Sequence, residues 1–297
     1  MMEDGAGCAA PELHSRVRSG HVAGEPQVRQ VEVDGAAIRY RLWDQAGPDA
    51  PGLLFAHGFR AHARWWDHIA PAFAHRFRVA ALDFSGFGDS DWRDAYFALT
   101  FARELLAVGE DAGLTPMTIV AHSFGGTPAA HAAFMAPEQV VRVVVIDSRM
   151  LIPALPEPAS EMLRTISRQN QVFDSAEALL GRFRLLPPVD EVAPELLDHI
   201  SRHSIRRVEE GWTWKFDARL DPQLNEDPGR FVPSNIQAPL NFIYGARSDV
   251  APPETAWTVA RYFGQGDPVF VAETNHHVPL ERPAALIGLL RGMIGGA

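Results

Sequence analysis

The chain has 297 residues, a length that suits one large α/β domain, or a core with a sizeable insertion, as well as two small domains. Its composition, with 46% hydrophobic and 22% charged residues, is ordinary for a globular protein and excludes collagen-like and low-complexity classes. A formal net charge of -10 argues against nucleic acid and anionic membrane surfaces as partners.

The single cysteine, Cys8, cannot close a disulfide within the chain and excludes a metal site built on several cysteines. Residues 1–26 mix small, charged and polar types without an apolar run of signal-peptide length, so we expect a disordered N-terminal tail. The sequence contains no run of about 18 apolar residues, so we expect no membrane-spanning helix. We therefore expect a cytoplasmic protein.

Two alternating segments flank the first turn signal of the chain. Apolar side chains at Val28, Val31 and Val33 precede Asp34-Gly35, and apolar and basic residues alternate over 38–42. Such a pattern predicts a β-hairpin.

Short apolar runs then alternate with helix-length stretches. Runs without polar alternation are typical of strands buried on both faces, as in a parallel sheet, and their alternation with helices predicts a doubly wound α/β fold. The predicted strands cover 53–56, 77–82, 117–121, 140–146, 240–244 and 269–272, and the predicted helices cover 63–74, 96–112, 124–135, 254–263 and 283–293.

The segment between Ser148 and Pro239 breaks this rhythm, because it contains helical patterns at 159–169, 176–183 and 194–208 but no strand-like run. A structureless loop of this length would be unusual in a compact domain. We therefore predict a helical cap inserted at 149–238 into a core formed by 27–148 and 239–297.

The strongest chemical signal is the segment 118–126, which reads as a strand, a sharp turn with small residues and then a helix. A turn of this kind exposes the Ser123 side chain at the carboxyl end of the strand. The bland alternative is that Ser123 only caps the following helix, since serine is a favoured cap.

These motifs together resemble those of serine hydrolases of the α/β-hydrolase fold that carry a helical cap. The family's nucleophile elbow G-x-S-x-G is present as Ala121-His122-Ser123-Phe124-Gly125, with alanine at its first position. Segment 83–90 matches the family's D-x-x-G-x-G-x-S pattern. The resemblance implies a mostly parallel eight-stranded sheet and Ser123 as the nucleophile.

The segment His57-Gly58-Phe59 matches the family's oxyanion turn, so the resemblance implies an oxyanion hole formed by the backbone N–H groups of Phe59 and Phe124. Segment 274–283 resembles the family's histidine loop, in which the catalytic imidazole precedes an acidic residue and a proline. Counting back from Glu281 selects His276 as the general base and leaves His277 as the alternative.

The acid that orients this histidine should follow a buried strand. Asp249, after the strand at 240–244, occupies the family's usual acid position, and the order Ser123, Asp249, His276 is that of the family. Asp147, which closes the strand at 140–146, is the rival, because some relatives take their acid from that earlier strand.

The expected substrate is a small molecule, and we expect neither a cofactor nor a metal. The pair His199 and His203 has the spacing of metal ligands, but no carboxylate motif accompanies it, and a solvated cap face is the preferred interpretation. Candidate residues for the substrate pocket are Trp65, Trp66, Trp212, Trp214 and His122.

The resemblance implies hydrolysis of a small, largely apolar carboxylic ester through an acyl-enzyme. One alternative is a carbon-carbon bond hydrolase of the meta-cleavage diketone type. A non-catalytic ligand-binding member of the fold is the other. The oligomeric state is left open.

Overall fold

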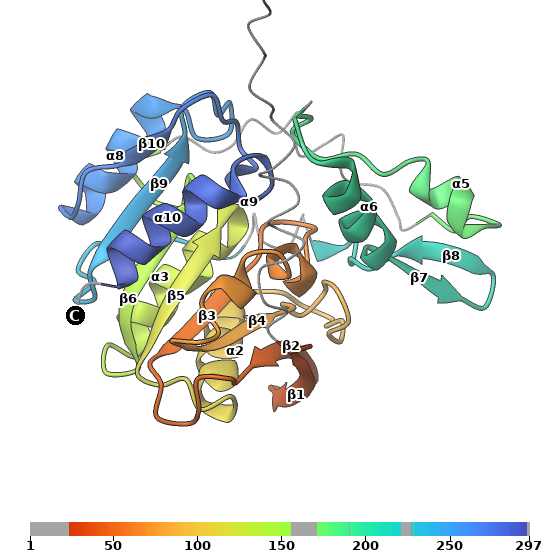
Figure 1. The fold of residues 1–297 in the computed structure, drawn as a ribbon, viewed down its shortest axis with the longest axis horizontal. Coiled ribbons are helices and arrows are strands. Elements are labelled where there is room, and N and C mark those ends of the chain that lie inside the picture. The colour runs from red at the N-terminus through yellow and green to blue at the C-terminus, as the bar shows by residue number, and fades with distance from the viewer. Residues whose placement is uncertain (1–23, 156–170, 190, 221–226, 228, 296–297) are drawn as a thin grey trace, which may run out of the picture.

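The core of the molecule is one twisted sheet of eight strands in the order β1-β2-β4-β3-β5-β6-β9-β10 (Figure 1). A computed structural model describes residues 24–155, 171–189, 191–220, 227 and 229–295, and the predicted tail at 1–26 lies almost wholly outside them. The strands of the sheet are β1 (Gln27–Val33), β2 (Ala36–Trp43), β3 (Gly52–Ala56), β4 (Arg78–Leu82), β5 (Met117–His122), β6 (Val140–Ile146), β9 (Leu240–Gly245) and β10 (Val269–Val271).

The predicted hairpin is formed by β1 and β2, which pair antiparallel with Val33 opposite Ala36. Both turn residues take the left-handed conformation, with φ of 47° at Asp34 and 76° at Gly35. Residues with positive φ match the twist of paired strands, which explains why this dipeptide predicts the turn.

From β3 onward the sheet is parallel. Strands β4 and β5 flank β3, while β6 and β9 extend the sheet to β10, and the antiparallel pairs of the sheet are β1–β2 and β2–β4. The predicted mostly parallel, doubly wound sheet is confirmed. All residues of β3 and β5 are buried, as expected for strands covered on both faces.

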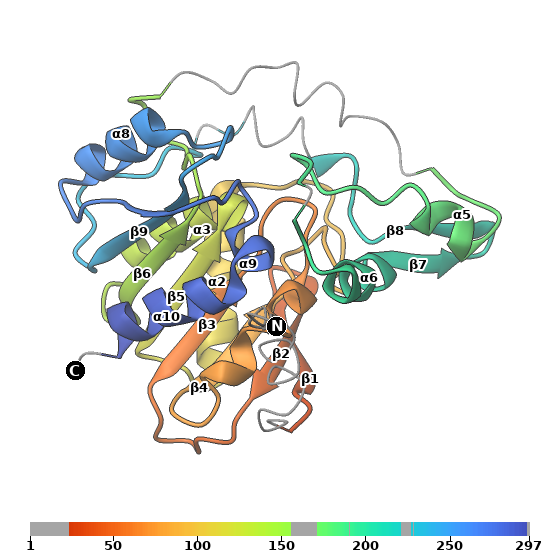
Figure 2. The same ribbon diagram turned by 45° about the horizontal axis from the view of Figure 1, so that its top comes forward.

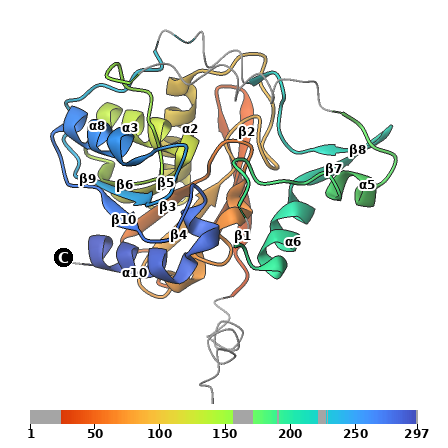
Figure 3. The ribbon, with the colours of Figure 1, turned by 90° about the horizontal axis from the view of Figure 1, so that it is seen from above.

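Helices cover the two faces of the sheet. Seen from above, α2 (Ala98–Asp111), α3 (Gly126–Met135) and α8 (Pro253–Phe263) lie on one face, and α10 (Pro283–Ile294) lies on the other (Figure 3). Two separate hydrophobic clusters fill these interfaces, the first against α2, α3 and α8 and the second against α10.

The predicted helix at 63–74 forms instead as two short 3-10 segments, η1 (Ala63–Trp66) and η2 (Ala70–Ala72). Pro71 interrupts the stretch, because it offers no N–H to a continuing helix and its ring clashes with the preceding turn. The segments still bury Trp66 and Ile69 beneath the sheet.

The described part of the segment predicted to form a helical cap is not wholly helical. It contains α5 (Ala176–Leu180) and α6 (Pro194–His203), but the predicted helix at 194–208 gives way to a hairpin of β7 (Ile205–Val208) and β8 (Gly211–Trp214) (Figure 2). Gly211 has a φ of 146°, which glycine tolerates, and aromatic and β-branched residues favour strand in β8. The predicted helix at 159–169 lies outside the described residues.

Described residues of the predicted cap contact loops that follow the carboxyl ends of β3 and β4. Asp217 donates its backbone N–H to Gly86 at 2.8 Å, and Phe216 forms a bridge with Phe87. Trp65 and Ile200 belong to a small hydrophobic cluster between core and cap. Among the described residues, no helix is both long and apolar enough to cross a bilayer.

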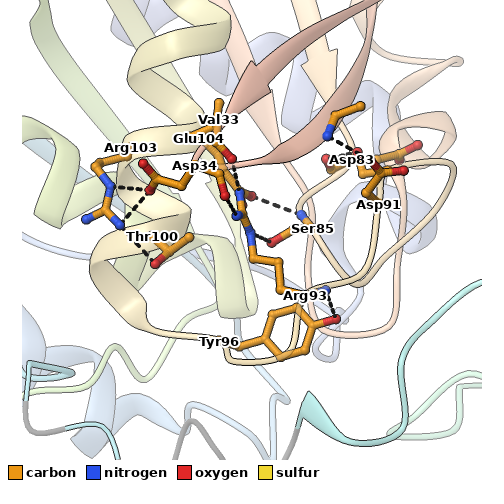
Figure 4. Close-up of polar contacts among 12 residues, drawn as sticks. Val33, Asp34, Asp83, Ser85, Asp91, Arg93, Tyr96, Thr100, Arg103 and Glu104 are labelled. Atoms are coloured by element: carbon orange, nitrogen blue, oxygen red, sulfur yellow. Dashed lines mark hydrogen bonds and ion pairs between the residues drawn. The ribbon is translucent and has the colours of Figure 1, made fainter.

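A buried ion pair ties the loop after β4 to α2 and to the first hairpin (Figure 4). Arg93 lies 3.0 Å from the Glu104 carboxylate and donates to the carbonyl of Val33 at 2.7 Å. Glu104 also accepts the backbone N–H of Ser85 at 2.9 Å. This network fixes the loop that supports one side of the cap.

Candidate active site

Ser123 stands at the carboxyl end of the central strand β5, between that strand and the short segment η3 (Ser123–Gly125) that leads into α3. Its φ of 51° is strained for a residue with a Cβ. Such strain is typical of functional sites, where the surrounding structure holds the residue in place.

Small residues are required beside this turn. A Cβ added to Gly125 would lie 2.8 Å from the His57 carbonyl oxygen, and one added to Gly126 would lie 2.7 Å from the Ser148 hydroxyl. Such contacts are too close for real side chains, so the two glycines allow the elbow to pack against β3 and β6. At the first position of the motif, Ala121 is fully buried and its methyl is accommodated.

Phe59 and Phe124 are neighbours across the turn, with ring centroids 5.9 Å apart. Neither backbone N–H donates any of the turn, loop or cap hydrogen bonds found within the described ranges. The loop carrying Phe59 is held by His57, which donates to the Gly58 carbonyl at 2.7 Å and accepts the Phe84 N–H at 3.1 Å. Burial lowers the pKa of His57 to about 4, so it is neutral at pH 7.

His276 lies buried in the loop between β10 and α9 (Val278–Glu281). The Glu281 carboxylate fixes this loop, because it accepts the backbone N–H groups of Asn275 and His277, each at 2.9 Å. The acidic residue of the histidine loop therefore shapes the backbone around His276.

The carboxylate beside His276 belongs to Asp147, which corrects the expectation of Asp249. His276 donates through Nδ1 to Asp147 Oδ1 at 2.8 Å, and both residues are buried. Asp249 is solvent-exposed and makes no hydrogen bond to His276 within the described chain. The expected role of Asp249 as orienting acid is wrong in this structure.

Asp147 is positioned by the strands around it. It follows β6 directly with a φ of 43°, and it accepts the Gly245 N–H at 2.7 Å and the Ser248 hydroxyl at 2.6 Å. Because β5 and β6 are parallel and His122 pairs with Ile146, Ser123 and Asp147 come next on adjacent strands at the same edge of the sheet. This strand register is the signal that favours Asp147.

Three imidazoles gather at this edge. The His122 ring lies 4.9 Å from that of His276, and the His277 ring lies 5.0 Å from it, measured between centroids. Burial, reinforced by the neighbouring imidazoles, holds the pKa of His122 well below its ordinary value and lowers that of His277 to about 3. The His277 ring donates to the Pro187 carbonyl and pairs with no carboxylate of the described residues, so the geometry favours His276 as the base.

The pocket candidates separate in the structure. Trp65 faces the site, with its ring 5.7 Å from His277 and 6.3 Å from His122. The expectation that Trp66 lines the substrate pocket is corrected. Trp66 packs in the core with its ring 4.8 Å from that of Phe55, because adjacent residues of a 3-10 turn point to different sides.

The two cap tryptophans lie on β8. The Trp214 ring stacks on Phe216 at 6.4 Å, and Phe216 in turn lies under Arg60, whose guanidinium carbon is 4.3 Å from the ring centroid. Trp212 pairs through its backbone with Phe173, and among the described residues no ring contact joins it to the three imidazoles. The sequence-based prediction passed over Phe87, whose ring lies 5.6 Å from Phe59.

Comparison with known proteins identifies relatives over most of the chain. A family model described as the alpha/beta hydrolase family matches residues 53–289. Esterase Rv0045c of Mycobacterium tuberculosis is 27% identical over 91% of this chain and 89% of that protein. Lipase LipV of the same organism is 25% identical over 84% of this chain and 95% of that protein.

Solved structures share the architecture. The thioesterase domain from the curacin biosynthetic pathway superposes with a TM-score of 0.74 at 24% identity, covering 90% of this chain and 99% of that one. E-2-(acetamidomethylene)succinate hydrolase superposes with a TM-score of 0.75 at 19% identity, covering 91% of this chain and 100% of that one. At this identity the likeness concerns the fold alone.

Proposed function

The chain belongs to the alpha/beta hydrolase family, and we propose on that basis that it is a serine esterase acting on small, largely apolar carboxylic esters. As a member of that family it is a hydrolase, and it carries serine at the nucleophile elbow. The observation that carries the proposal is the buried Asp147–His276 pair at the sheet edge where Ser123 stands in a strained turn.

In the proposed first step, Ser123 Oγ attacks the ester carbonyl and His276 Nε2 accepts its proton. Asp147 holds the Nδ1 proton of His276, so Nε2 carries the lone pair, and the carboxylate stabilises the imidazolium that forms. The Ser123 hydroxyl makes no hydrogen bond to another described residue in this structure. Catalytic hydrogen bonds are often long before substrate binds.

The proposed oxyanion hole consists of the backbone N–H groups of Phe59 and Phe124. Each would donate to the carbonyl oxygen as its charge develops. The imidazolium then protonates the leaving alcohol, which leaves an acyl group on Ser123. Water deprotonated by His276 attacks this acyl-enzyme, and the imidazolium returns that proton to Ser123 Oγ as the carboxylic acid leaves, so the cycle closes with Ser123 and His276 in their starting states.

An apolar acyl group suits the surroundings of this site. The rings of Phe59, Phe87 and Phe124 contact one another beside the oxyanion turn, and Trp65 faces the imidazoles. Apolar walls with few polar groups are typical of small-molecule pockets. Relatives named esterase and lipase support an ester as the substrate class.

The proposal is tested by hydrolysis of p-nitrophenyl acetate. Ser123→Ala should lower kcat by about 10⁴-fold or more, because no other group replaces the nucleophile. Ser175→Ala is the matched control, since Ser175 only caps α5 through the Ala178 N–H. Wild-type turnover in Ser123→Ala would refute the assignment.

Turnover of esters compared with turnover of vinylogous diketones distinguishes the alternatives. A carbon-carbon bond hydrolase would prefer a vinylogous diketone from ring cleavage to every ester offered. A non-catalytic binding protein would turn over neither substrate class and would bind them with Ser123 unmodified.

A further inference from the structure

A cluster of three buried histidines lies beside the proposed nucleophile, and the proposed ester hydrolysis uses only one of them. His122 ends β5, and His276 and His277 lie in the loop after β10. One ring nitrogen from each lies within 4.8 Å of the other two. The three residues are 2%, 5% and 3% exposed, respectively, so the cluster is shielded from solvent.

Each ring has one nitrogen engaged by an acceptor. His122 Nε2 donates to the His276 carbonyl at 3.0 Å, and His277 Nε2 donates to the Pro187 carbonyl at 3.0 Å. His276 Nδ1 donates to Asp147 at 2.8 Å. Carbonyl and carboxylate oxygens only accept, so the proton of each neutral ring sits on the engaged nitrogen and the other nitrogen carries a lone pair.

The three remaining nitrogens have no hydrogen-bond partner among the residues that the structure describes. Nδ1 of His122 and Nδ1 of His277 are buried without a hydrogen bond in the described part of the chain. His276 Nε2 likewise receives none from any described residue. A buried acceptor that is left unsatisfied costs about 1–3 kcal/mol, so two of them in one cluster require an explanation.

We propose that these three nitrogens form a binding site for a divalent transition-metal ion such as Zn²⁺, and that the bound ion inhibits the enzyme. Imidazole is a preferred ligand of Zn²⁺, Cu²⁺ and Ni²⁺. Histidines that bind metals almost always donate their other N–H to a carboxylate or a backbone carbonyl. All three rings of this cluster meet that condition with Asp147, Pro187 and the His276 carbonyl.

The geometry requires only a small contraction. Zn²⁺ binds imidazole nitrogen at about 2.0–2.1 Å, so three tetrahedral ligands lie roughly 3.4 Å apart. One nitrogen from each of the three rings already lies within 4.8 Å of the other two, so side-chain movements of about 1 Å would bring three ring nitrogens to that spacing. Side-chain rotation of the three histidines supplies this movement without a change in strand pairing.

The inhibition follows from the position of the ion and rests on the proposed function. An ion on His276 Nε2 occupies the lone pair that would accept the Ser123 proton. His122 Nδ1 also lies near Ser123. A Cβ built on Gly58 would be 2.9 Å from His122 Nδ1 and 3.3 Å from Ser123 Cβ, so the two atoms border the same small space. The ion would therefore sit against the nucleophile as well as the base.

The test measures binding and turnover separately. Calorimetric titration of the full chain with ZnCl₂ should show one site, and Zn²⁺ should inhibit p-nitrophenyl acetate hydrolysis reversibly, with recovery on adding EDTA. His277→Gln retains an amide N–H for the Pro187 carbonyl but places no ring nitrogen in the cluster. It should weaken both binding and inhibition by about 10-fold or more while metal-free turnover persists.

Two further variants serve as controls. His203→Gln removes one of the histidine pair on α6, where His203 donates to the His199 carbonyl at 2.7 Å, and it should leave Zn²⁺ binding unchanged. His122→Gln, scored by calorimetry alone, should weaken binding as His277→Gln does. Zn²⁺ binding that survives both cluster variants, or that is lost in His203→Gln, would overturn the proposal.

The two proposals fail in different ways. Tight Zn²⁺ binding without any ester turnover would leave the metal site standing and refute the esterase. Full turnover with no calorimetric binding would leave the esterase standing and refute the metal site.

Discussion

Asp147 is the residue on which the proposed proton transfer most depends. Its carboxylate is fully buried and holds three donors: the His276 ring, the Gly245 N–H and the Ser248 hydroxyl. These contacts fix the side chain before substrate arrives, and the carboxylate in turn fixes which nitrogen of His276 is protonated.

Asp147→Asn should therefore lower kcat for p-nitrophenyl acetate by about 10³–10⁴-fold, because an amide can stabilise the wrong tautomer of His276. Asp249→Asn is the matched control and should keep near wild-type kcat, since Asp249 is exposed. Steady-state kinetics on the two purified variants check this. A larger loss of kcat in Asp249→Asn than in Asp147→Asn would instead identify Asp249, after β9, as the orienting acid.

At this scale the sequence singled out Ser123 and the histidine loop as candidates because each sits in a dense local motif. Asp147 and Asp249 were harder to separate, since both follow buried strands and both have family precedent. The distinction depends on how β5 and β6 pair, which places Asp147 beside Ser123, and on the loop after β9, which turns Asp249 toward solvent. Both are long-range features that a local pattern does not contain.

At the scale of elements, local pattern was a good guide wherever a strand is buried on both faces. The run at 140–146 is β6 without change, and the hairpin follows from Asp34-Gly35. The cap was less predictable, because α6 ends at His203 and the chain then forms β7 and β8. Short amphipathic segments satisfy helical and strand patterns alike, and cross-strand pairing in the hairpin decides between them.

The loop after β4 offers an element-scale prediction (Figure 4). Burial raises the pKa of Glu104, whose side chain is 0% exposed, and Arg93 compensates its charge. Arg93→Met would leave an uncompensated buried carboxylate and should lower the free energy of unfolding by about 3–5 kcal/mol.

Arg103→Met is the control for that variant. Arg103 pairs with Asp34 on the surface, where the two side chains are 44% and 52% exposed, so its loss should cost less than about 1 kcal/mol. Urea denaturation of both variants checks the difference. Equal destabilisation would mean that burial does not set the strength of these pairs.

For the whole molecule, buried histidines predict how stability depends on pH. Burial lowers the pKa of His57 to about 4 and that of His277 to about 3, from an ordinary value of 6.5. The unfolded chain therefore binds more protons below pH of about 6.5, so the free energy of unfolding falls as the pH drops from there toward about 4. At a pH of about 5.5, each of these two histidines should lower the free energy of unfolding by roughly 1 kcal/mol.

Asp83 acts in the opposite direction. Burial raises its pKa to about 6, so its contribution to stability is present at low pH and is lost as the pH rises through that value. Two histidines outweigh this single carboxyl, and the net effect is acid destabilisation. Urea denaturation at pH 7.5 and 5.5 checks this net effect. The difference in the free energy of unfolding between the two pH values should be smaller in His57→Gln than in the wild type. It should be unchanged in the control His75→Gln, which alters an exposed histidine.

Labelling by a fluorophosphonate probe tests most directly the central claim for the whole molecule, that Ser123 is the nucleophile. The account predicts one probe adduct, located by peptide mass spectrometry on Ser123, absent from Ser123→Ala and formed more slowly in Asp147→Asn. Ester turnover accompanied by an adduct on another residue, or by no adduct at all, would contradict it.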